Sequence, residues 1–345
     1  MAEFKHSTII PINIMTEEHE EKGVVGILNM GNTCYANATI QLLKAFPALS
    51  AFCLSQESNP TKEDTKEAKV WLGYRDLLNS LWSGNRPAYC RPAGFLAAIH
   101  EAVQNTPYDQ FATRMPNDAH EYLCFLLDRF QMAVGRPLPE PPEDADPETK
   151  AWHAAFLKDF SPVVSKFFGQ LVKSVKCSNC NNTSKTYEVF NSLKVSPQTP
   201  TVSLEKALEQ EFHDEEIDEY SCEKCEGRHK ASVSHKIQRL PPYLFTVIRR
   251  FEGTGRKDHR PVSVTDETLS LESFVTESCA EANKPYKLLG IVDHHGSAFG
   301  GHYVAQVKHL ANNRWYLYDD ETSHSLSGPS VGPSAYIMGW SRQTD

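Results

Sequence analysis

One cysteine, Cys34, stands where a turn-rich segment meets an apolar helix pattern. The preceding residues 26–33 include two glycines and two asparagines, which tolerate sharp turns and positive φ angles. From Cys34 onward, apolar residues recur at helical spacing until Pro47 ends the pattern. We therefore predict Cys34 at a helix N-terminus, where free N–H groups and the helix dipole favour an anion and lower the pKa of a thiol.

A nucleophilic thiol also needs a donor for the oxyanion that forms when it attacks a carbonyl group. Asn29 lies on the predicted loop just upstream and can aim its side-chain amide at that position. The alternative is that Cys34 is a small apolar residue of a core helix, which is the commoner role of a free cysteine.

His302 is the best candidate for a general base. A glycine-rich loop, residues 293–301, leads into it, and the pattern places His302 at the first position of a strand. The next predicted strand ends at Asp319 and Asp320, whose carboxylates can accept a hydrogen bond from the imidazole. Cysteine, histidine and aspartate in this chain order are typical of papain-like thiol hydrolases. The alternative is a turn histidine followed by two solvated acids.

Two further pairs of cysteines predict a structural metal site. Cys177 and Cys180 form one Cys-x-x-Cys motif, and Cys222 and Cys225 form another. Four thiolates at this spacing suit a closed tetrahedral zinc site, whereas a redox motif needs only one pair. We therefore expect Zn²⁺ to hold a long hairpin together and to take no part in catalysis.

The elements that must position these groups change character along the chain. Helical patterns cover residues 34–46, 66–82, 92–103, 117–130 and 203–212. Alternating patterns that predict strands cover residues 171–175, 187–189, 233–237, 244–251, 286–292, 301–307 and 314–318. Because helices fill the first half and antiparallel strands the second, we predict an α+β fold.

The helix predicted over residues 117–130 begins with two acids. Asp118 is placed as its N-cap, and Glu121 follows as the partner in a capping box. The other role for both acids is contact with a cationic ligand, which requires that the first turn be exposed. Residues 135–150 are rich in proline and acid and predict a surface loop or a short linker.

Composition narrows the class of protein. The chain of 345 residues is 40% hydrophobic, which is enough for a sizeable core, and residues 1–22 resemble an extension outside the fold. No apolar run is long enough to span a membrane, and the N-terminus is not a signal peptide. The net charge of -9 disfavours nucleic acid as a ligand and suits a basic partner. We expect an intracellular monomer, cytoplasmic or nuclear, that binds neither nucleic acid nor membranes.

From about Gly23 to Trp340 the sequence resembles the ubiquitin-specific protease family of cysteine deubiquitinases. The run Gly-Asn-Thr-Cys-Tyr-Ala-Asn around Cys34 resembles the cysteine box of that family, and Asp-Ala-His-Glu-Tyr-Leu resembles its acidic helix motif. Gly-Gly-His-Tyr-Val together with Tyr-Asp-Asp resembles its histidine box. The chain departs from the family pattern at Pro116 and Asn117, where two glutamines are usual, and at Tyr122, where phenylalanine is usual.

The resemblance implies a single papain-like catalytic domain over residues 23–345 with a right-hand architecture. A helical thumb, residues 23–160, would carry Cys34, and residues 161–345 would form a palm sheet and fingers. The zinc-bound fingers, about residues 171–240, would grip ubiquitin.

The resemblance also implies residue roles. Asp319 matches the third member of a catalytic triad, Asn29 the oxyanion donor, and Asp320 a second acid that orients the histidine or polarises the oxyanion. Residues 252–260 and 293–301 resemble two loops that close over the substrate tail. The substrate-binding residues implied in this way are Asp118, Glu121, His294, His295, Gly300, Gly301 and Tyr303.

We therefore expect a cysteine protease that cuts isopeptide or peptide bonds after the C-terminal glycine of ubiquitin through a thioester. Its partners would be ubiquitin and ubiquitinated proteins. The alternatives are a catalytically inactive ubiquitin-binding module, a protease for a ubiquitin-like modifier, and a zinc ribbon that binds nucleic acid.

Overall fold

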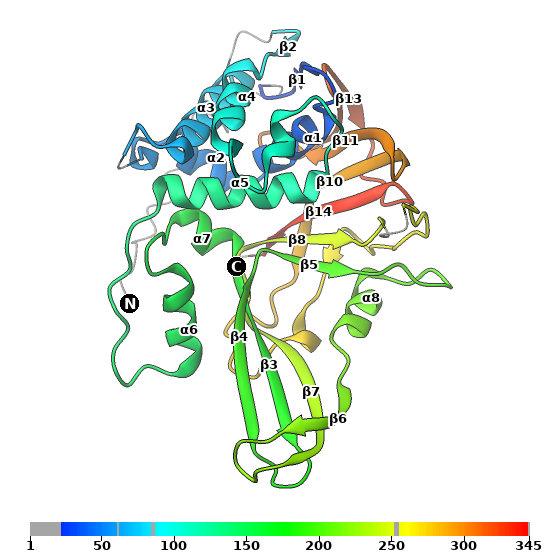
Figure 1. Cartoon of the computed structure of the whole chain (residues 1–345). Coiled ribbons are helices and arrows are strands. Elements are labelled where there is room, and N and C mark those ends of the chain that lie inside the picture. The colour runs from blue at the N-terminus through cyan, green and yellow to red at the C-terminus, as the bar shows by residue number, and fades with distance from the viewer. Residues whose placement is uncertain (1–21, 61, 84–86, 252–254, 344–345) are drawn as a thin grey trace.

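A cluster of helices, a broad sheet and a long narrow sheet make up the molecule (Figure 1). The computed structural model describes residues 22–60, 62–83, 87–251 and 255–343. We call the helical part the thumb, the broad sheet the palm and the narrow sheet the fingers. The predicted extension, residues 1–22, lies outside the described residues except for Lys22.

The thumb is built around helix α1 (Cys34–Lys44), whose residues are all buried. It packs between helix α5 and the palm strands β10 and β11. The other thumb helices are α2 (Pro47–Leu54), α3 (Lys66–Leu81), α4 (Ala93–Val103), α5 (Ala119–Val134), α6 (Pro147–Phe156) and α7 (Pro162–Phe167), with short 3-10 turns η3 (Gln56–Ser58) and η4 (Asp109–Ala112). Because this helix has no exposed face, its polar residues are buried along with its apolar ones, for example Asn37, Gln41 and Lys44.

The palm is an eight-stranded sheet whose main path runs in the order β13, β12, β11, β10, β14, β8 and β5. Its strands are β5 (Ser192–Val195), β8 (Tyr243–Ile248), β9 (Thr268–Leu269), β10 (Tyr286–Ser297), β11 (Gly300–Lys308), β12 (Trp315–Asp319), β13 (Thr322–Leu326) and β14 (Ala335–Arg342). Helix α8 (Leu204–Glu211) lies against β5, and η5 (Glu272–Phe274) follows β9. Neighbouring strands are antiparallel as predicted, with the exception that β5 pairs with β8 in parallel.

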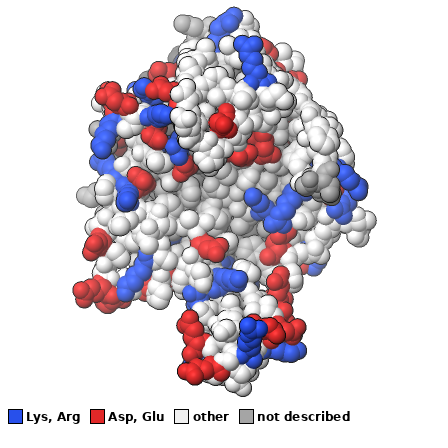
Figure 2. All heavy atoms as spheres, in the orientation of Figure 1, with Lys and Arg blue, Asp and Glu red and all other residues white. Residues whose placement is uncertain are grey.

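The fingers are a four-stranded sheet in the order β4, β3, β7 and β6. The strands are β3 (Gly169–Cys177), β4 (Thr183–Phe190), β6 (Glu215–Ser221) and β7 (Arg228–Arg239). Most residues of β4 and β6 are exposed, and acidic and basic side chains are mixed over this part of the surface (Figure 2). A sheet with so little buried surface needs another source of stability at its far end.

A small parallel pair of strands, β1 (Gly26–Ile27) and β2 (Tyr89–Cys90), carries the chain into α1. Here the backbone approaches the turn between β12 and β13 closely, because Ile27 donates its N–H to the carbonyl of Asp320 at 2.7 Å. A Cβ atom added at Gly26 would lie 2.2 Å from the backbone of Glu321. Glycine is therefore required for this approach.

The α+β class is confirmed, but several predicted boundaries are wrong. Helices α2, α6 and α7 were not predicted, and α6 begins inside the predicted surface loop 135–150. Helix α1 ends at Lys44, before the predicted end at residue 46, and Pro47 is the first residue of α2 because proline suits the first turn of a helix. Residues 293–301 were predicted as a loop, yet they mostly form a hairpin between β10 and β11.

Candidate active site

Cys34 is the first residue of α1, as predicted, and its side chain is buried. The predicted lowering of its pKa is wrong for this structure. Burial, the largest influence, raises the pKa of the thiol, and the carboxylate of Asp320 raises it further. The backbone N–H groups of Tyr303 and Tyr35 lower the pKa by less. The thiol is therefore held in its protonated form until a base removes the proton.

His302 lies on strand β11 of the palm, between two residues that line the cleft next to Cys34, Gly301 and Tyr303. It is the third residue of β11 and not the first, because the strand begins at Gly300. Its Nε2 atom lies 2.6 Å from Oδ1 of Asp319 and 4.0 Å from Oδ2 of Asp320. Since Asp319 engages Nε2, Nδ1 is the ring nitrogen left to exchange a proton with a thiol. The next residue, Tyr303, is the one whose N–H influences Cys34.

Asp319 and Asp320 sit side by side at the turn between β12 and β13 but face different environments. Asp319 ends β12, and its side chain is 48% exposed, whereas that of Asp320 is 10% exposed. Asp320 adopts a left-handed backbone conformation with φ of 46°, which aspartate tolerates in hairpin turns. The turn therefore offers one carboxylate to the imidazole and directs the other towards the thumb.

Asn29 is held by hydrogen bonds on both sides of its amide. Its Nδ2 donates to Oδ2 of Asp320 at 2.8 Å, and its Oδ1 accepts from the N–H groups of Gly31 and Thr33 at 2.9 and 3.2 Å. A primary amide carries two N–H donors, so one remains after the bond to Asp320. The amide of Asn29 is thus fixed in place, and its second Nδ2–H can donate to another group.

Two residues in this network were missed by the sequence reasoning. Asn37 donates from Nδ2 to Oδ1 of Asp320 at 2.7 Å, and Glu321 accepts from the backbone N–H of Asn29 at 3.0 Å. Asp320 therefore joins the loop before Cys34 to helix α1. The signal for Asn37 was an amide within the helical run three residues after Cys34, since a buried amide needs partners.

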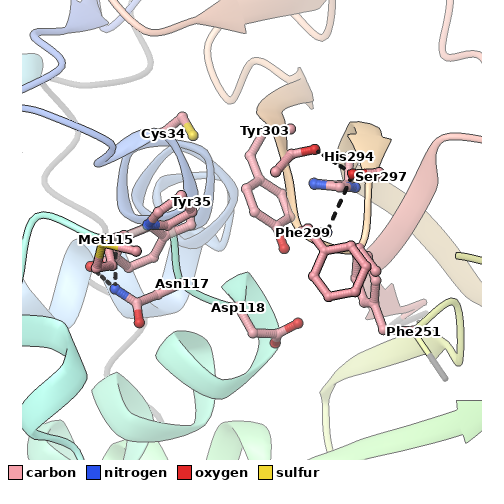
Figure 3. Close-up of a pocket in the computed structure, with 14 residues that line it drawn as sticks. Cys34, Tyr35, Met115, Asn117, Asp118, Phe251, His294, Ser297, Phe299 and Tyr303 are labelled. Carbon is pink, nitrogen blue, oxygen red and sulfur yellow. Dashed lines mark hydrogen bonds between the residues drawn. The ribbon is translucent and has the colours of Figure 1, made fainter. Parts of the chain in front are cut away.

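A cleft of about 390 Å³ opens beside the thiol (Figure 3). Cys34 and Tyr35 line one side, and Tyr303 and His294 face them from the palm (Figure 3). The other lining residues are Met115, Pro116, Asn117, Asp118, Phe251, Ser297, Ala298, Phe299, Gly300 and Gly301. Met115 and Phe299 are exposed apolar residues on this lining, with 66% and 84% exposure. Such side chains suit contact with a ligand.

Five of the seven predicted substrate-binding residues line the cleft: Asp118, His294, Gly300, Gly301 and Tyr303. Among the described residues, Glu121 and His295 are not part of this lining. His295 is exposed and pairs with His302 across the hairpin, and the Glu121 side chain accepts a hydrogen bond from Gln110 at 2.9 Å.

Asp118 fulfils its predicted capping role and also bridges to the palm. Its Oδ1 accepts from the N–H of Glu121 at 2.8 Å, while its Oδ2 accepts from the hydroxyl of Tyr336 at 2.6 Å. Because the Glu121 side chain turns to Gln110, the reciprocal half of the predicted capping box is replaced by another contact. The Asp118–Tyr336 bond joins α5 to β14 at the side of the cleft.

His294 is a buried ring among aromatic neighbours. Its centroid lies 4.5 Å from that of Tyr303 and 5.1 Å from that of Phe251. Burial lowers its pKa to about 4, so the ring is neutral at pH 7. Lys257 donates to the backbone carbonyl of His294 at 2.5 Å and so joins the two predicted closing loops. Residues 252–254 of the first loop lie outside the described residues.

The four cysteines of the two Cys-x-x-Cys motifs meet at the far end of the fingers. Their sulfur atoms all lie within 4.8 Å of one another, with 3.8 Å between Cys177 and Cys225 and 3.6 Å between Cys180 and Cys222. Zinc–sulfur bonds of roughly 2.3 Å in a tetrahedron place sulfur atoms about 3.8 Å apart. The donor set and its spacing therefore fit a tetrahedral zinc ion.

These features define the class of the fold. A helical thumb, a palm sheet and four-cysteine fingers surround a cleft lined by a thiol, and this is the papain-like right-hand architecture that the sequence predicts. Comparison with known proteins leads to the same class and narrows it further.

A family model described as ubiquitin carboxyl-terminal hydrolase matches residues 25–340. The chain therefore belongs to the ubiquitin carboxyl-terminal hydrolase family, and the predicted identification as a ubiquitin-specific protease catalytic domain is confirmed. The chain is 29% identical over 343 residues to ubiquitin carboxyl-terminal hydrolase Usp2 of Drosophila melanogaster, which covers 95% of this chain and 36% of that protein. It is 26% identical over 354 residues to human ubiquitin carboxyl-terminal hydrolase 21, with 92% and 61% covered.

Solved structures agree on the fold. A chain of the SAGA DUB module (Ubp8/Sgf11/Sus1/Sgf73) bound to monoubiquitin aligns with a TM-score of 0.77 and 22% identity, covering 94% of this chain and 70% of that one. The same module bound to ubiquitin aldehyde aligns with a TM-score of 0.75. The chain spans about a third of the fly relative and about three fifths of the human one. Within the described residues, no helix has the length and apolar character needed to cross a membrane.

Proposed function

We propose that the chain hydrolyses isopeptide and peptide bonds after the C-terminal glycine of ubiquitin. The observation that carries the proposal is the 2.6 Å contact between His302 and Asp319 next to the cleft lined by Cys34. Family membership and neighbours that hold ubiquitin support the choice of substrate. Ubiquitin and ubiquitinated proteins are thus the proposed partners.

In the proposed reaction, Nδ1 of His302 accepts the thiol proton and the Cys34 sulfur attacks the carbonyl carbon of the terminal glycine. The spare N–H of Asn29 and the backbone N–H of Cys34 donate to the resulting oxyanion. His302 then protonates the leaving lysine amine, and a thioester remains on Cys34. Water, deprotonated by the same histidine, attacks the thioester, and the ubiquitin carboxylate leaves while the thiol regains its proton. Asp319 holds the imidazole in the required tautomer and orientation.

The lining of the cleft offers contacts for the tail of such a substrate, including one acid, Asp118, and two glycines, Gly300 and Gly301. We propose that Asp118 faces a basic residue of the tail and that the hairpin residues Gly300 and Gly301 lie along it. Two glycines at the scissile end of ubiquitin pass a channel that larger side chains would block. We also propose that Cys177, Cys180, Cys222 and Cys225 hold a structural zinc ion in the fingers, because their donor set fits one.

The proposal is tested with a fluorogenic ubiquitin conjugate. Cys34→Ala should lower turnover by about 10⁴-fold or more, because the nucleophile is lost, while ubiquitin binding is kept. Cys279→Ala, which removes a buried thiol of the second core cluster, is the matched control and should retain turnover. Retained turnover in Cys34→Ala would contradict this assignment of the nucleophile.

A ubiquitin molecule with an electrophile at its C-terminus separates the enzyme from an inactive binding module. The protease should form a covalent adduct through Cys34, whereas a binding module would only bind reversibly. The same experiment with electrophilic probes made from ubiquitin-like modifiers shows which modifier reacts with Cys34.

A further inference from the structure

A proline-rich segment at the end of helix α5 plays no part in the proposed reaction. It reads Arg136-Pro-Leu-Pro-Glu-Pro-Pro142 and lies at the left edge of Figure 1, between α5 and α6. Helix α5 spans 16 residues, so at 1.5 Å per residue its two ends are roughly 24 Å apart. The segment is therefore remote from Asp118, which caps the end of α5 at the cleft.

The sequence of the segment restricts its backbone to the extended and polyproline II region. From Arg136 to Pro142 every residue is either a proline or directly precedes one. Proline fixes φ near -65°, and the residue before a proline is confined to extended or polyproline II geometry. The segment contains no helix or strand in the structure, apart from an isolated bridge between Arg136 and Phe160. The segment is therefore confined to extended or polyproline II backbone, and the polyproline II form has three residues per turn.

Three residues per turn place Arg136, Pro139 and Pro142 along one edge. All three are exposed, whereas Leu138 and Pro141 on the next edge are half-buried. Leu138 packs against the small cluster of Trp152, Phe156 and Val164, and its N–H donates to Leu157 at 2.9 Å. The fold thus fixes the segment along one edge and presents another edge to solvent.

Arg136 places a positive charge at the N-terminal end of this edge, which would fix the orientation of the segment in a groove. Across the described part of the chain, its guanidinium forms no hydrogen bond or ion pair, although acidic residues follow the segment at Glu143 and Asp144. Arg136 precedes Pro139 by three residues, and Pro139 precedes Pro142 by three. A free guanidinium at this position can pair with a carboxylate at one end of a groove that binds the two prolines. Aromatic-lined grooves of SH3 domains bind PxxP segments and gain affinity because the ligand is already ordered.

We infer that residues 136–142 are a docking site for an SH3 domain, with Pro139 and Pro142 in its aromatic groove and Arg136 on an acidic residue beside that groove. The docked domain would sit on the thumb, away from the cleft, so the cleft stays open to its substrate.

The test uses the full chain and a purified SH3 domain selective for Arg-x-x-Pro-x-x-Pro ligands, with the dissociation constant measured by calorimetry. Pro139→Ala/Pro142→Ala should weaken binding by about tenfold or more, because both groove contacts are lost. Pro137→Ala is the matched control. It makes the same chemical change on a different edge and should change affinity by less than about threefold.

Arg136→Gln tests the charge separately and cannot unfold the segment through a lost contact, since its guanidinium has no partner among the described residues. It should weaken binding about tenfold, while Arg136→Lys should retain most of the affinity. Unchanged thermal unfolding of each variant shows that the fold is intact. The inference is overturned if the full chain does not bind the SH3 domain, or if a WW domain binds and the SH3 domain does not. It is also overturned if Pro139→Ala/Pro142→Ala leaves the dissociation constant unchanged.

Discussion

At the scale of single residues, the adjacent acids Asp319 and Asp320 serve different purposes. Asp319 contacts the imidazole of His302, whereas the two oxygens of Asp320 accept from Asn29 and Asn37. Asp320 therefore acts mainly on the loop that precedes the thiol and on helix α1. The turn between β12 and β13 separates an imidazole-orienting group from a group that positions the thumb loop.

We predict that Asp319→Asn and Asp320→Asn lower turnover of a ubiquitin conjugate for different reasons. Asp319→Asn loses the carboxylate that fixes the tautomer of His302, so kcat should fall by about 10²- to 10⁴-fold. Asp320→Asn offers one acceptor to two amides, so the Asn29 loop loosens and kcat should fall by about 10-fold. Steady-state kinetics of both variants give the comparison, and a large loss in Asp320→Asn alone would show that Asp320 is the orienting acid.

The raised pKa of Cys34 gives a second residue-scale prediction. A raised pKa means that the thiol stays protonated to higher pH than a free cysteine, so its alkylation should increase at a correspondingly higher pH. Asp320→Asn removes a negative charge that opposes the thiolate, so the pKa should fall and the alkylation midpoint should move to lower pH.

Iodoacetamide labelling of Cys34 at a series of pH values measures this midpoint. Asp319→Asn is the control, because its carboxylate is not among the groups that shift the Cys34 pKa. A midpoint that moves upward in Asp320→Asn would contradict the electrostatic explanation.

At the scale of elements, the fingers depend on the four cysteines for the order of their far end. Strands β4 and β6 are mostly exposed, and the sheet has little apolar surface to bury there. Cys177 at the end of β3 is joined by the motif that follows β6, so one ion would connect segments 48 residues apart. The metal would thus replace a core that this sheet lacks.

We predict that zinc removal by a chelator, or Cys180→Ser, unfolds the fingers before the thumb and palm. Hydrogen exchange should become faster in β3 and β7 near the cysteines, while α1 and β10 remain protected by the main cores. Mass spectrometry of exchanged peptides and the zinc content of the protein provide the measurements. Cys279→Ser should keep its zinc, and equal loss of protection in α1 would show that the metal supports the whole fold.

The elements that the sequence predicted well have strong local signals. Helix α5 has an apolar stripe and a capping aspartate, and the pattern fixed its start at Asp118. By contrast, residues 293–301 were predicted as a loop because of their three glycines, yet tertiary pairing keeps most of them in the strands β10 and β11. The positions of Cys34 and His302 within their elements could be predicted to within two residues because both lie in long sequence motifs.

The rest of the candidate site depends on contacts that no local pattern contains. The bonds of Asp320 to Asn29 and Asn37 and of Asp118 to Tyr336 join residues more than 200 positions apart, with separations of 291, 283 and 218. The net direction of the Cys34 pKa likewise depends on burial and on Asp320. Such long-range geometry follows from the complete fold only.

At the scale of the whole molecule, strand β1 near the start of the domain packs against the turn between β12 and β13 near its end. Gly26 in β1 lies against the backbone of Asp320 and Glu321, and Ile27 donates to the carbonyl of Asp320. Helix α1 lies in a core that thumb and palm share. Stability and site geometry are therefore coupled at this junction.

We predict that Gly26→Ala destabilises the protein and reduces turnover together. The added Cβ would lie 2.2 Å from the Glu321 backbone, so the chain must shift, at a cost of about 1–3 kcal/mol in free energy of unfolding. Gly94→Ala in α4 is the matched control, because nothing lies within 4 Å of its Cβ position and alanine favours a helix. Urea midpoints measure both variants, and an unchanged midpoint in Gly26→Ala would show that the junction yields easily.

The link between Asn29 and Asp320 spans 291 positions of sequence. Translation runs from the N-terminus, so Cys34 is made well before His302 and before Asp320, the acid that fixes the Asn29 loop. A nascent chain that stops before His302 therefore carries the Cys34 thiol without its proposed base. Under the proposed mechanism, the order of synthesis alone keeps the thiol unreactive until strands β11 and β12 have been made.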